Sequence, residues 1–204
     1  MSGAQPVLWI TGHDEAHDPI AAKTFGFWLY MMSDALIFAA LFAAYGVLDH
    51  GFNAAGGPAA PQVVHPLGAF WQTLAVFASV LAYNLAMVRL KAGSRWGVLL
   101  GLAIAGLLGA VFVGLESVDF LRLVAQGAVP ERSGFLSAFF ILVATHGLHM
   151  LFGLLWIAVM MLQVLTKGFT TETVTRLLNL RLFWTFQASI WVCVFVFVYL
   201  RGIF

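Results

Sequence analysis

The chain has 204 residues, of which 62% are hydrophobic and 9% are charged, and its formal net charge is +1. A soluble domain has roughly 45–50% apolar residues, so this composition excludes one and predicts a polytopic membrane protein. The ten Lys and Arg are scattered, which argues against nucleic acid as a partner, and the single cysteine, Cys193, excludes an intrachain disulfide or a thiolate metal cluster.

Five apolar stretches are long enough to cross about 30 Å of hydrocarbon as helices, at residues 25–48, 66–90, 96–121, 134–165 and 182–200. These stretches lack the alternation that a membrane barrel needs, so we predict an all-α fold with five transmembrane helices. Residues 25–204 form one domain in this interpretation. Residues 1–24 form an N-terminal tail, which has no continuous apolar core and is unlike a cleavable signal peptide.

The cations near the ends of these stretches predict the orientation. With five spans, seven of these cations are expected on the same side as the N-terminus. The other three, Arg122, Arg132 and Arg201, are expected on the other side. The seven are Lys23, Arg89, Lys91, Arg95, Lys167, Arg176 and Arg181. Because cytoplasmic loops carry the excess of Lys and Arg, we expect the N-terminus in the cytoplasm and the C-terminus outside. Four tryptophans lie near the ends of the predicted spans and are expected to anchor them at the membrane–water interface: Trp28, Trp71, Trp96 and Trp184.

Four ionisable side chains fall inside the predicted spans: Asp34, Glu116, His146 and His149. Each costs at least ~2.5–3.5 kcal/mol at the centre of a membrane helix, so each is expected to face protein or water and to have a partner. Asp119 and Arg122 continue the face of Glu116 in three-residue steps, which favours a salt-bridge ladder at the membrane boundary. A path for protons or cations through these residues is the alternative.

The two histidines share one helix face, since they are three residues apart. Two ligands do not make a zinc site, and no other predicted span contains a histidine that could complete a haem site. Hydrogen bonding between helices is therefore the favoured interpretation.

Depth along the helices predicts the partner of the histidines. Asp34 lies roughly 14 Å in from the cytoplasmic boundary, and His146 and His149 lie ~18 Å and ~22 Å in from the outer boundary. These depths overlap, whereas Glu116 is expected near the opposite face. We therefore predict that Asp34 accepts a hydrogen bond from one histidine, directly or through a water, and that this contact joins the first helix to the fourth.

Four segments together carry a family resemblance: residues 25–34 (FGFWLYMMSD), 114–120 (GLESVDF), 132–140 (RSGFLSAFF) and 145–149 (THGLH). They resemble subunit III of the haem-copper respiratory oxidases, and the likeness is closest to the cytochrome o type ubiquinol oxidases, whose subunit III has five spans. The resemblance covers nearly all of residues 25–204.

The resemblance implies an accessory subunit that has no catalytic, cofactor-binding or metal-binding residues of its own. Haem and copper are expected in the catalytic subunit I, beside which this chain would lie with subunits II and IV in a bacterial plasma membrane. Such a complex oxidises ubiquinol, reduces oxygen to water and pumps protons. Family members also hold phospholipid, whose headgroups would meet cations at the cytoplasmic helix ends: Arg89, Lys167, Arg176 and Arg181.

The chain departs from the family near its last helix, where a Trp-His-Phe-x-Asp pattern is replaced by residues 184–188 (WTFQA). Any role of that His and Asp therefore does not carry over. Two alternatives stay open, a subunit III of a cytochrome c oxidase and a free-standing small proton or ion transporter. A transporter predicts inverted repeats or broken helices, and neither is visible in the sequence.

Overall fold

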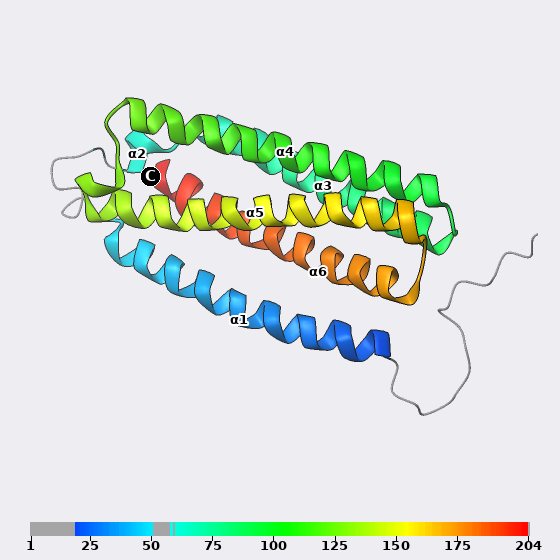
Figure 1. Ribbon diagram of the computed structural model, residues 1–204. Helices are drawn as coiled ribbons and strands as arrows, with labels where there is room; N and C mark the ends of the chain where they lie inside the picture. Colours follow the sequence, from blue (N-terminus) through cyan, green and yellow to red (C-terminus); the bar gives the residue numbers. More distant parts are fainter. Residues whose placement is uncertain (1–18, 51–57, 59, 204) are drawn as a thin grey trace, which may run out of the picture.

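The computed structural model describes residues 19–50, 58 and 60–203, so most of the predicted N-terminal tail lies outside the described residues. Five long helices lie side by side and alternate in direction along the chain (Figure 1). They are α1 (Pro19–Leu48), α3 (Pro66–Lys91), α4 (Arg95–Ala125), α5 (Gly134–Lys167) and α6 (Thr171–Val194). All five are long and apolar enough to cross a membrane, α6 together with the segment after it. The predicted all-α fold with five membrane helices is thus confirmed.

Short elements complete the bundle. Helix α2 (Ala60–Val63) precedes α3, and a 3₁₀ turn at Pro130–Arg132 joins α4 to α5. After α6 the chain continues as a π-helical segment at Phe195–Leu200 and ends in a 3₁₀ turn at Arg201–Ile203. We call the end with the α3–α4 and α5–α6 turns the basic end, and the end that contains the C-terminus the opposite end (Figure 1).

Local sequence signals explain where the helices begin and end. The Ser133 hydroxyl accepts from the Leu136 backbone N–H at 3.1 Å and caps α5, and Ser94 and Thr170 cap α4 and α6 in the same way. Such side chains satisfy backbone donors that the first helical turn leaves free. Helix α5 ends at Gly168, whose φ of 68° is accessible to glycine at little cost. The two turns at the basic end therefore follow from their sequence.

Two helix starts differ from the expected bounds. Helix α1 begins at Pro19 instead of residue 25, and α6 begins at Thr171 instead of residue 182. Residues 171–181 are too polar to be recognised as part of an apolar span. They are nevertheless helical because Thr170 caps them and because Thr173, Val174 and Leu177 are buried against the bundle. Arg176 and Arg181 consequently lie on α6 and not in a loop.

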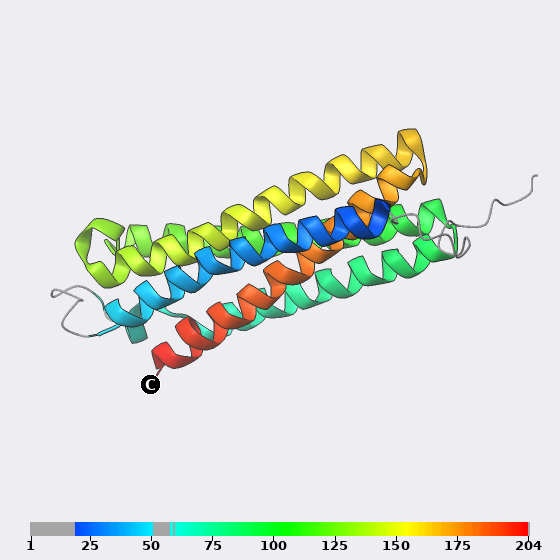
Figure 2. The same cartoon turned by 90° about the horizontal axis from the view of Figure 1, so that it is seen from below.

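Helices α3 and α4 approach each other closely at Gly101. A Cβ built on Gly101 would lie 2.6 Å from the Ala86 Cβ and 3.2 Å from the Ala82 carbonyl oxygen. Small residues allow this approach, as they commonly do between membrane helices. Helix α1 packs mainly on α5 and α6, at the edge of the bundle, and Figures 1 and 2 both show it diverging from α5 towards the basic end.

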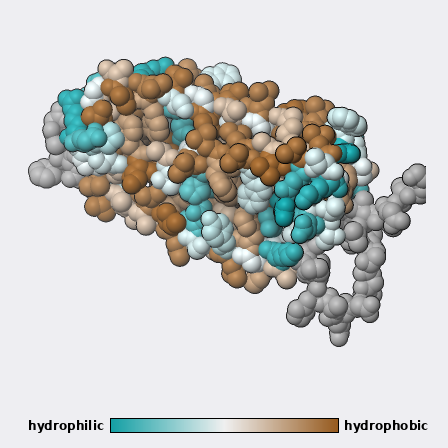
Figure 3. Space-filling view, viewed as in Figure 1, coloured by the Kyte–Doolittle hydropathy of each residue, from teal (hydrophilic) through white to brown (hydrophobic). Residues whose placement is uncertain are grey.

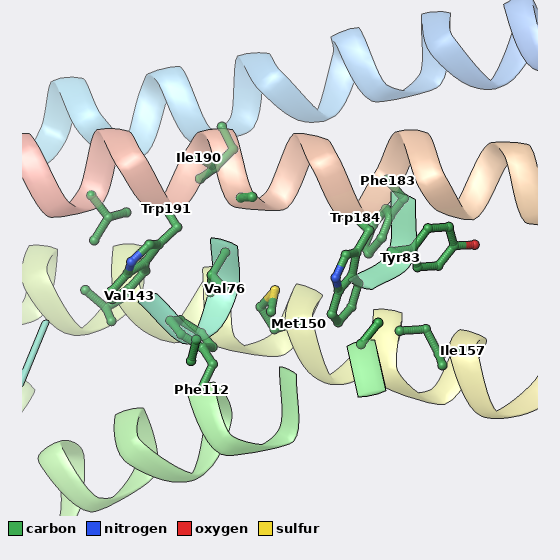
Figure 4. Packing of buried hydrophobic residues seen from close by; sticks show 14 of the residues in the cluster. Val76, Tyr83, Phe112, Val143, Met150, Ile157, Phe183, Trp184, Ile190 and Trp191 are labelled. Atoms are coloured by element: carbon green, nitrogen blue, oxygen red, sulfur yellow. The ribbon is translucent and has the colours of Figure 1, made fainter. Parts of the chain in front are cut away.

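The core lies where α6 faces α3, α4 and α5, and Figure 4 shows Trp184 and Trp191 of α6 among its side chains. Trp184 is 2% exposed and donates from Nε1 to Ser79 Oγ at 2.9 Å, so its predicted place at a membrane interface is wrong. The early start of α6 explains the error, because it moves Trp184 away from the helix end. Trp28, Trp71 and Trp96 are exposed.

The surface that Figure 3 shows is mostly hydrophobic, and hydrophilic residues gather near its two ends, with a smaller patch between. Exposed side chains along the helices include Leu36 and Ile37 on α1, Leu107 on α4 and Leu155 on α5. Such a surface suits contact with lipid tails or with apolar faces of other membrane chains.

Candidate functional site

Asp34 of α1 and His149 of α5 meet inside the bundle. Asp34 Oδ1 lies 3.2 Å from His149 Nε2, and the two side chains are 7% and 23% exposed. This is the contact between the first and fourth predicted spans that depth along the helices suggests. The ring of Phe38, one turn after Asp34, packs against His149, with the two ring centroids 5.2 Å apart.

His149 makes two polar contacts. Its Nδ1 lies 2.7 Å from the Thr145 carbonyl oxygen, one turn earlier on the same helix, and its Nε2 faces the Asp34 carboxyl group. The ring therefore connects the backbone of α5 to a side chain of α1.

His146 has a different partner, although it lies on the same face of α5. Its Nε2–H donates to the Gln187 carbonyl oxygen of α6 at 3.1 Å, and the residue is fully buried. Its ring contacts Phe112 of α4 and Trp191 of α6, both labelled in Figure 4, at centroid distances of 5.5 and 5.3 Å, and these two rings also contact each other at 4.6 Å. His146 thus joins α5 to α6, while His149 joins α5 to α1.

Glu116 is not part of a salt-bridge ladder. Asp119 pairs with Arg122 at 3.5 Å and accepts from Gln72 Nε2 at 2.8 Å, whereas Glu116 is 4% exposed and its Oε1 has no hydrogen-bond partner among the described residues. The predicted ladder is therefore limited to Asp119 and Arg122.

Glu116 also lies closer to the histidines than we expected. Its carboxyl group lies against Gly147, which is next to His146 along α5. The expected depths assumed that each helix is just long enough to cross a hydrocarbon core of about 30 Å. Helices α4 and α5 have 31 and 34 residues, about 46 and 51 Å at 1.5 Å per residue, so hydropathy does not determine how far one is shifted along the other.

A groove of about 880 Å³ lies between α1, α5 and α6, where α1 and α5 diverge. Its walls are hydrophobic and largely aromatic, with Phe27 from α1, Phe152 and Trp156 from α5 and Phe183 from α6. His149 lines the groove as well, so one member of the polar pair borders an apolar space. A groove of this size and polarity suits a hydrocarbon chain better than a charged ligand.

The four cations predicted to contact lipid headgroups are all exposed and belong to the half of the molecule at the basic end. Two of them also have polar partners within the chain. Arg181 Nε donates to Asn84 Oδ1 at 2.8 Å, and Arg176 Nη1 donates to Gln163 Oε1 at 3.1 Å. Arg89 and Lys167 lie at the last turns of α3 and α5.

Sequence reasoning missed several polar residues that join the helices. Ser79 of α3 donates to the Ala105 carbonyl oxygen at 2.7 Å and accepts from Trp184, and Trp191 Nε1 donates to Thr73 Oγ1 at 2.9 Å. Gln187 is fully buried, and its side-chain amide has no partner among the described residues. The prediction considered ionisable groups alone, and the missed signal was the uncharged polar residues inside the apolar spans, such as Thr73 and Ser79 on α3.

Chemically, these contacts hold helices together and can bind protons. In the described ranges no three His, Cys, Asp or Glu side chains are grouped so that they could hold a metal ion. Asp34 and His149 are two groups, and His146 points to a different helix. The site is a set of contacts between helices beside an apolar groove.

Fold and site together define a bundle of membrane helices joined by buried polar residues. The family described as cytochrome c oxidase subunit III matches residues 11–203, so the chain belongs to this family. It is 44% identical to the cytochrome bo(3) ubiquinol oxidase subunit 3 of Pseudomonas aeruginosa, over 93% of this chain and 90% of that protein.

Two further relatives show the breadth of the family. The protein of the same name from Pseudomonas putida is 44% identical over 100% of this chain and 97% of its own length. A cytochrome c oxidase subunit 3 from a Bacillus species is 36% identical over 88% of this chain and 86% of that protein.

Proposed function

We propose that the chain is subunit III of a proton-pumping ubiquinol oxidase of the cytochrome o type. The observation that supports this most strongly is the 44% identity, over nearly the full length of both chains, to relatives named as subunits of such oxidases. A relative named for cytochrome c oxidase is less similar, at 36% identity. Membership of the family also argues against a free-standing transporter.

In this proposal the chain does not catalyse the reaction and binds no haem or copper. It lies beside the catalytic subunit I, in one complex with subunits II and IV, in a bacterial plasma membrane. Its contribution is to keep the complex assembled during turnover. The exposed apolar surface of α1, at the edge of the bundle, suits contact with a second membrane chain or with lipid.

Phospholipid is the ligand that we propose for the groove between α1, α5 and α6. An acyl chain would lie along the aromatic walls, and the headgroup would lie towards the basic end, where Arg89, Lys167, Arg176 and Arg181 are exposed. Apolar walls and cations at one end match the two parts of a phospholipid.

Purification of the tagged chain in mild detergent tests the proposed function. We expect haem-bearing partners, an oxidase spectrum, and oxygen consumption with ubiquinol but not with reduced cytochrome c. Activity with cytochrome c alone would favour the alternative subunit III, and a chain that purifies without a haem protein would contradict both. Material from cells without the tag serves as the control.

A further inference from the structure

Glu116 is a buried acid to which the proposed function gives no role. Its carboxyl group lies between α4 and α5, against the backbone of Gly147. A Cβ built on Gly147 would lie 2.5 Å from Glu116 Oε2, so the glycine leaves the space that the carboxyl group occupies.

Within the described part of the chain, Glu116 has no counter-charge. Arg122 pairs with Asp119 instead, and no ion pair reaches Glu116. Glu116 Oε1 is buried and has no hydrogen-bond partner among the residues that the structure describes. A buried carboxylate without a partner is costly, whereas a carboxylic acid is neutral and has a hydrogen to donate.

A cavity of about 10 Å³ adjoins Glu116 and is also lined by His65, Asp119 and Tyr199. This is close to the smallest volume that holds one water molecule. Asp119, which also lines the cavity, accepts from Gln72 Nε2 at 2.8 Å. A water in the cavity could donate a hydrogen to Glu116, whose Oε1 has no hydrogen-bond partner among the described residues.

The groups around the cavity indicate where a proton could enter. His65, just before α3, is exposed near the opposite end, and the Asp119 side chain is 19% exposed. Tyr199 lies in the π-helical segment, Arg122 is on α4 beside Asp119, and His146 is next to Gly147 on α5. The only acid near Glu116 in this set is Asp119, and Arg122 offsets its charge.

We propose that Glu116 is a proton-binding site supplied from the opposite end of the bundle, past His65 and Asp119, through a cavity for one water. An O–H bond of hydronium breaks, and a new O–H bond forms at Glu116. The carboxylate charge is cancelled, and no other reactant is needed. The proposal concerns the bundle itself and does not depend on the electron donor of the complex.

Infrared difference spectra of the intact complex that the chain forms, recorded during a pH titration in H₂O and D₂O, test this proposal. We expect the carbonyl band of a protonated carboxylic acid, shifted in D₂O and lost in Glu116→Gln. Glu172→Gln is the matched control, because Glu172 on α6 is an exposed acid whose side chain is 65% exposed. That control should keep the band.

A second variant covers the case in which Glu116→Gln prevents assembly. Glu116→Asp keeps an acid with a shorter side chain, so the band should remain at a different frequency. Asp119→Asn should slow hydrogen exchange of the band if protons enter past this residue. A band that is absent from the native complex, that survives in Glu116→Gln, or that is unmoved in Glu116→Asp would overturn the proposal.

Discussion

The contact between Asp34 and His149 joins two helices through a single pair of atoms 3.2 Å apart. Asp34→Ala removes the partner of His149 Nε2 and leaves a buried polar group unsatisfied. We expect the complex to lose about 1–3 kcal/mol of stability, without a change in haem content. Denaturation of the purified complex, followed by the dissociation of this chain, measures the loss.

Ser33→Ala is the matched control for that change. Ser33 is the preceding residue on α1, it is exposed, and its hydroxyl donates to the Tyr30 carbonyl oxygen of its own helix. Its replacement should alter stability by a few tenths of a kcal/mol. Equal stability of the two variants would show that Asp34 does not hold α1 in place.

At this scale the sequence predicts which ionisable residues are buried better than it predicts their partners. Charge inside an apolar run is visible in the sequence, and Asp34, Glu116 and His146 are all buried. The partner depends on how far two helices are shifted along each other, which neither hydropathy nor length determines. Glu116 shows the consequence, because its neighbour is Gly147 and not Arg122.

At the scale of helices, the close approach of α3 and α4 depends on Gly101. Gly101→Ala would place a Cβ 2.6 Å from that of Ala86 and 3.0 Å from the Ala86 Cα, where backbone would have to move. We expect a loss of about 1–3 kcal/mol, as for overpacked interiors. Thermal unfolding of the purified complex measures it.

Gly114→Ala provides the comparison on the same helix, since a Cβ at Gly114 has nothing within 4 Å. It should leave stability unchanged or raise it slightly, because alanine favours helix more than glycine does. If both substitutions cost the same, the approach at Gly101 is not what holds the two helices together.

The sequence predicts the number of membrane helices correctly, but it does not predict where α1 and α6 begin. The length of the apolar stretches identifies all five membrane helices, because a helix needs about 20 apolar residues to cross the hydrocarbon core. Hydropathy does not detect the first turns of α6, because they lie towards the end of the bundle and contain Arg176 and Arg181. Their helical structure depends on the Thr170 cap and on tertiary packing, which a hydropathy window does not include.

For the whole molecule, the orientation in the membrane stays a prediction. Seven of the ten Lys and Arg belong to the side of the N-terminus, which we expect in the cytoplasm. A phosphatase that is active only outside the cytoplasm should be active when fused after Phe204 and inactive when inserted at residues 92–94. The reverse pattern would overturn the orientation.

The chain as a whole is also expected to bind lipid and not metal. His146 and His149 have separate partners, and neither belongs to a ligand set among the described residues. Elemental analysis of the isolated chain should find well under one zinc, copper or iron per chain, and mass spectrometry should find retained phospholipid. About one metal ion per chain would contradict this interpretation.

The position of α1 has a consequence for biosynthesis. This helix is made first, but its packing partners α5 and α6 are made last, and the contact of Asp34 with His149 spans 115 residues of sequence. Until α5 is inserted, Asp34 lacks its partner His149, at a cost of ~2.5–3.5 kcal/mol near the centre of a membrane helix. Helices α3 and α4 are neighbours in sequence and can pair as soon as both are inserted. We therefore expect α1 to stay at the edge of the growing bundle until α5 is inserted, and to dock in one of the last steps of folding.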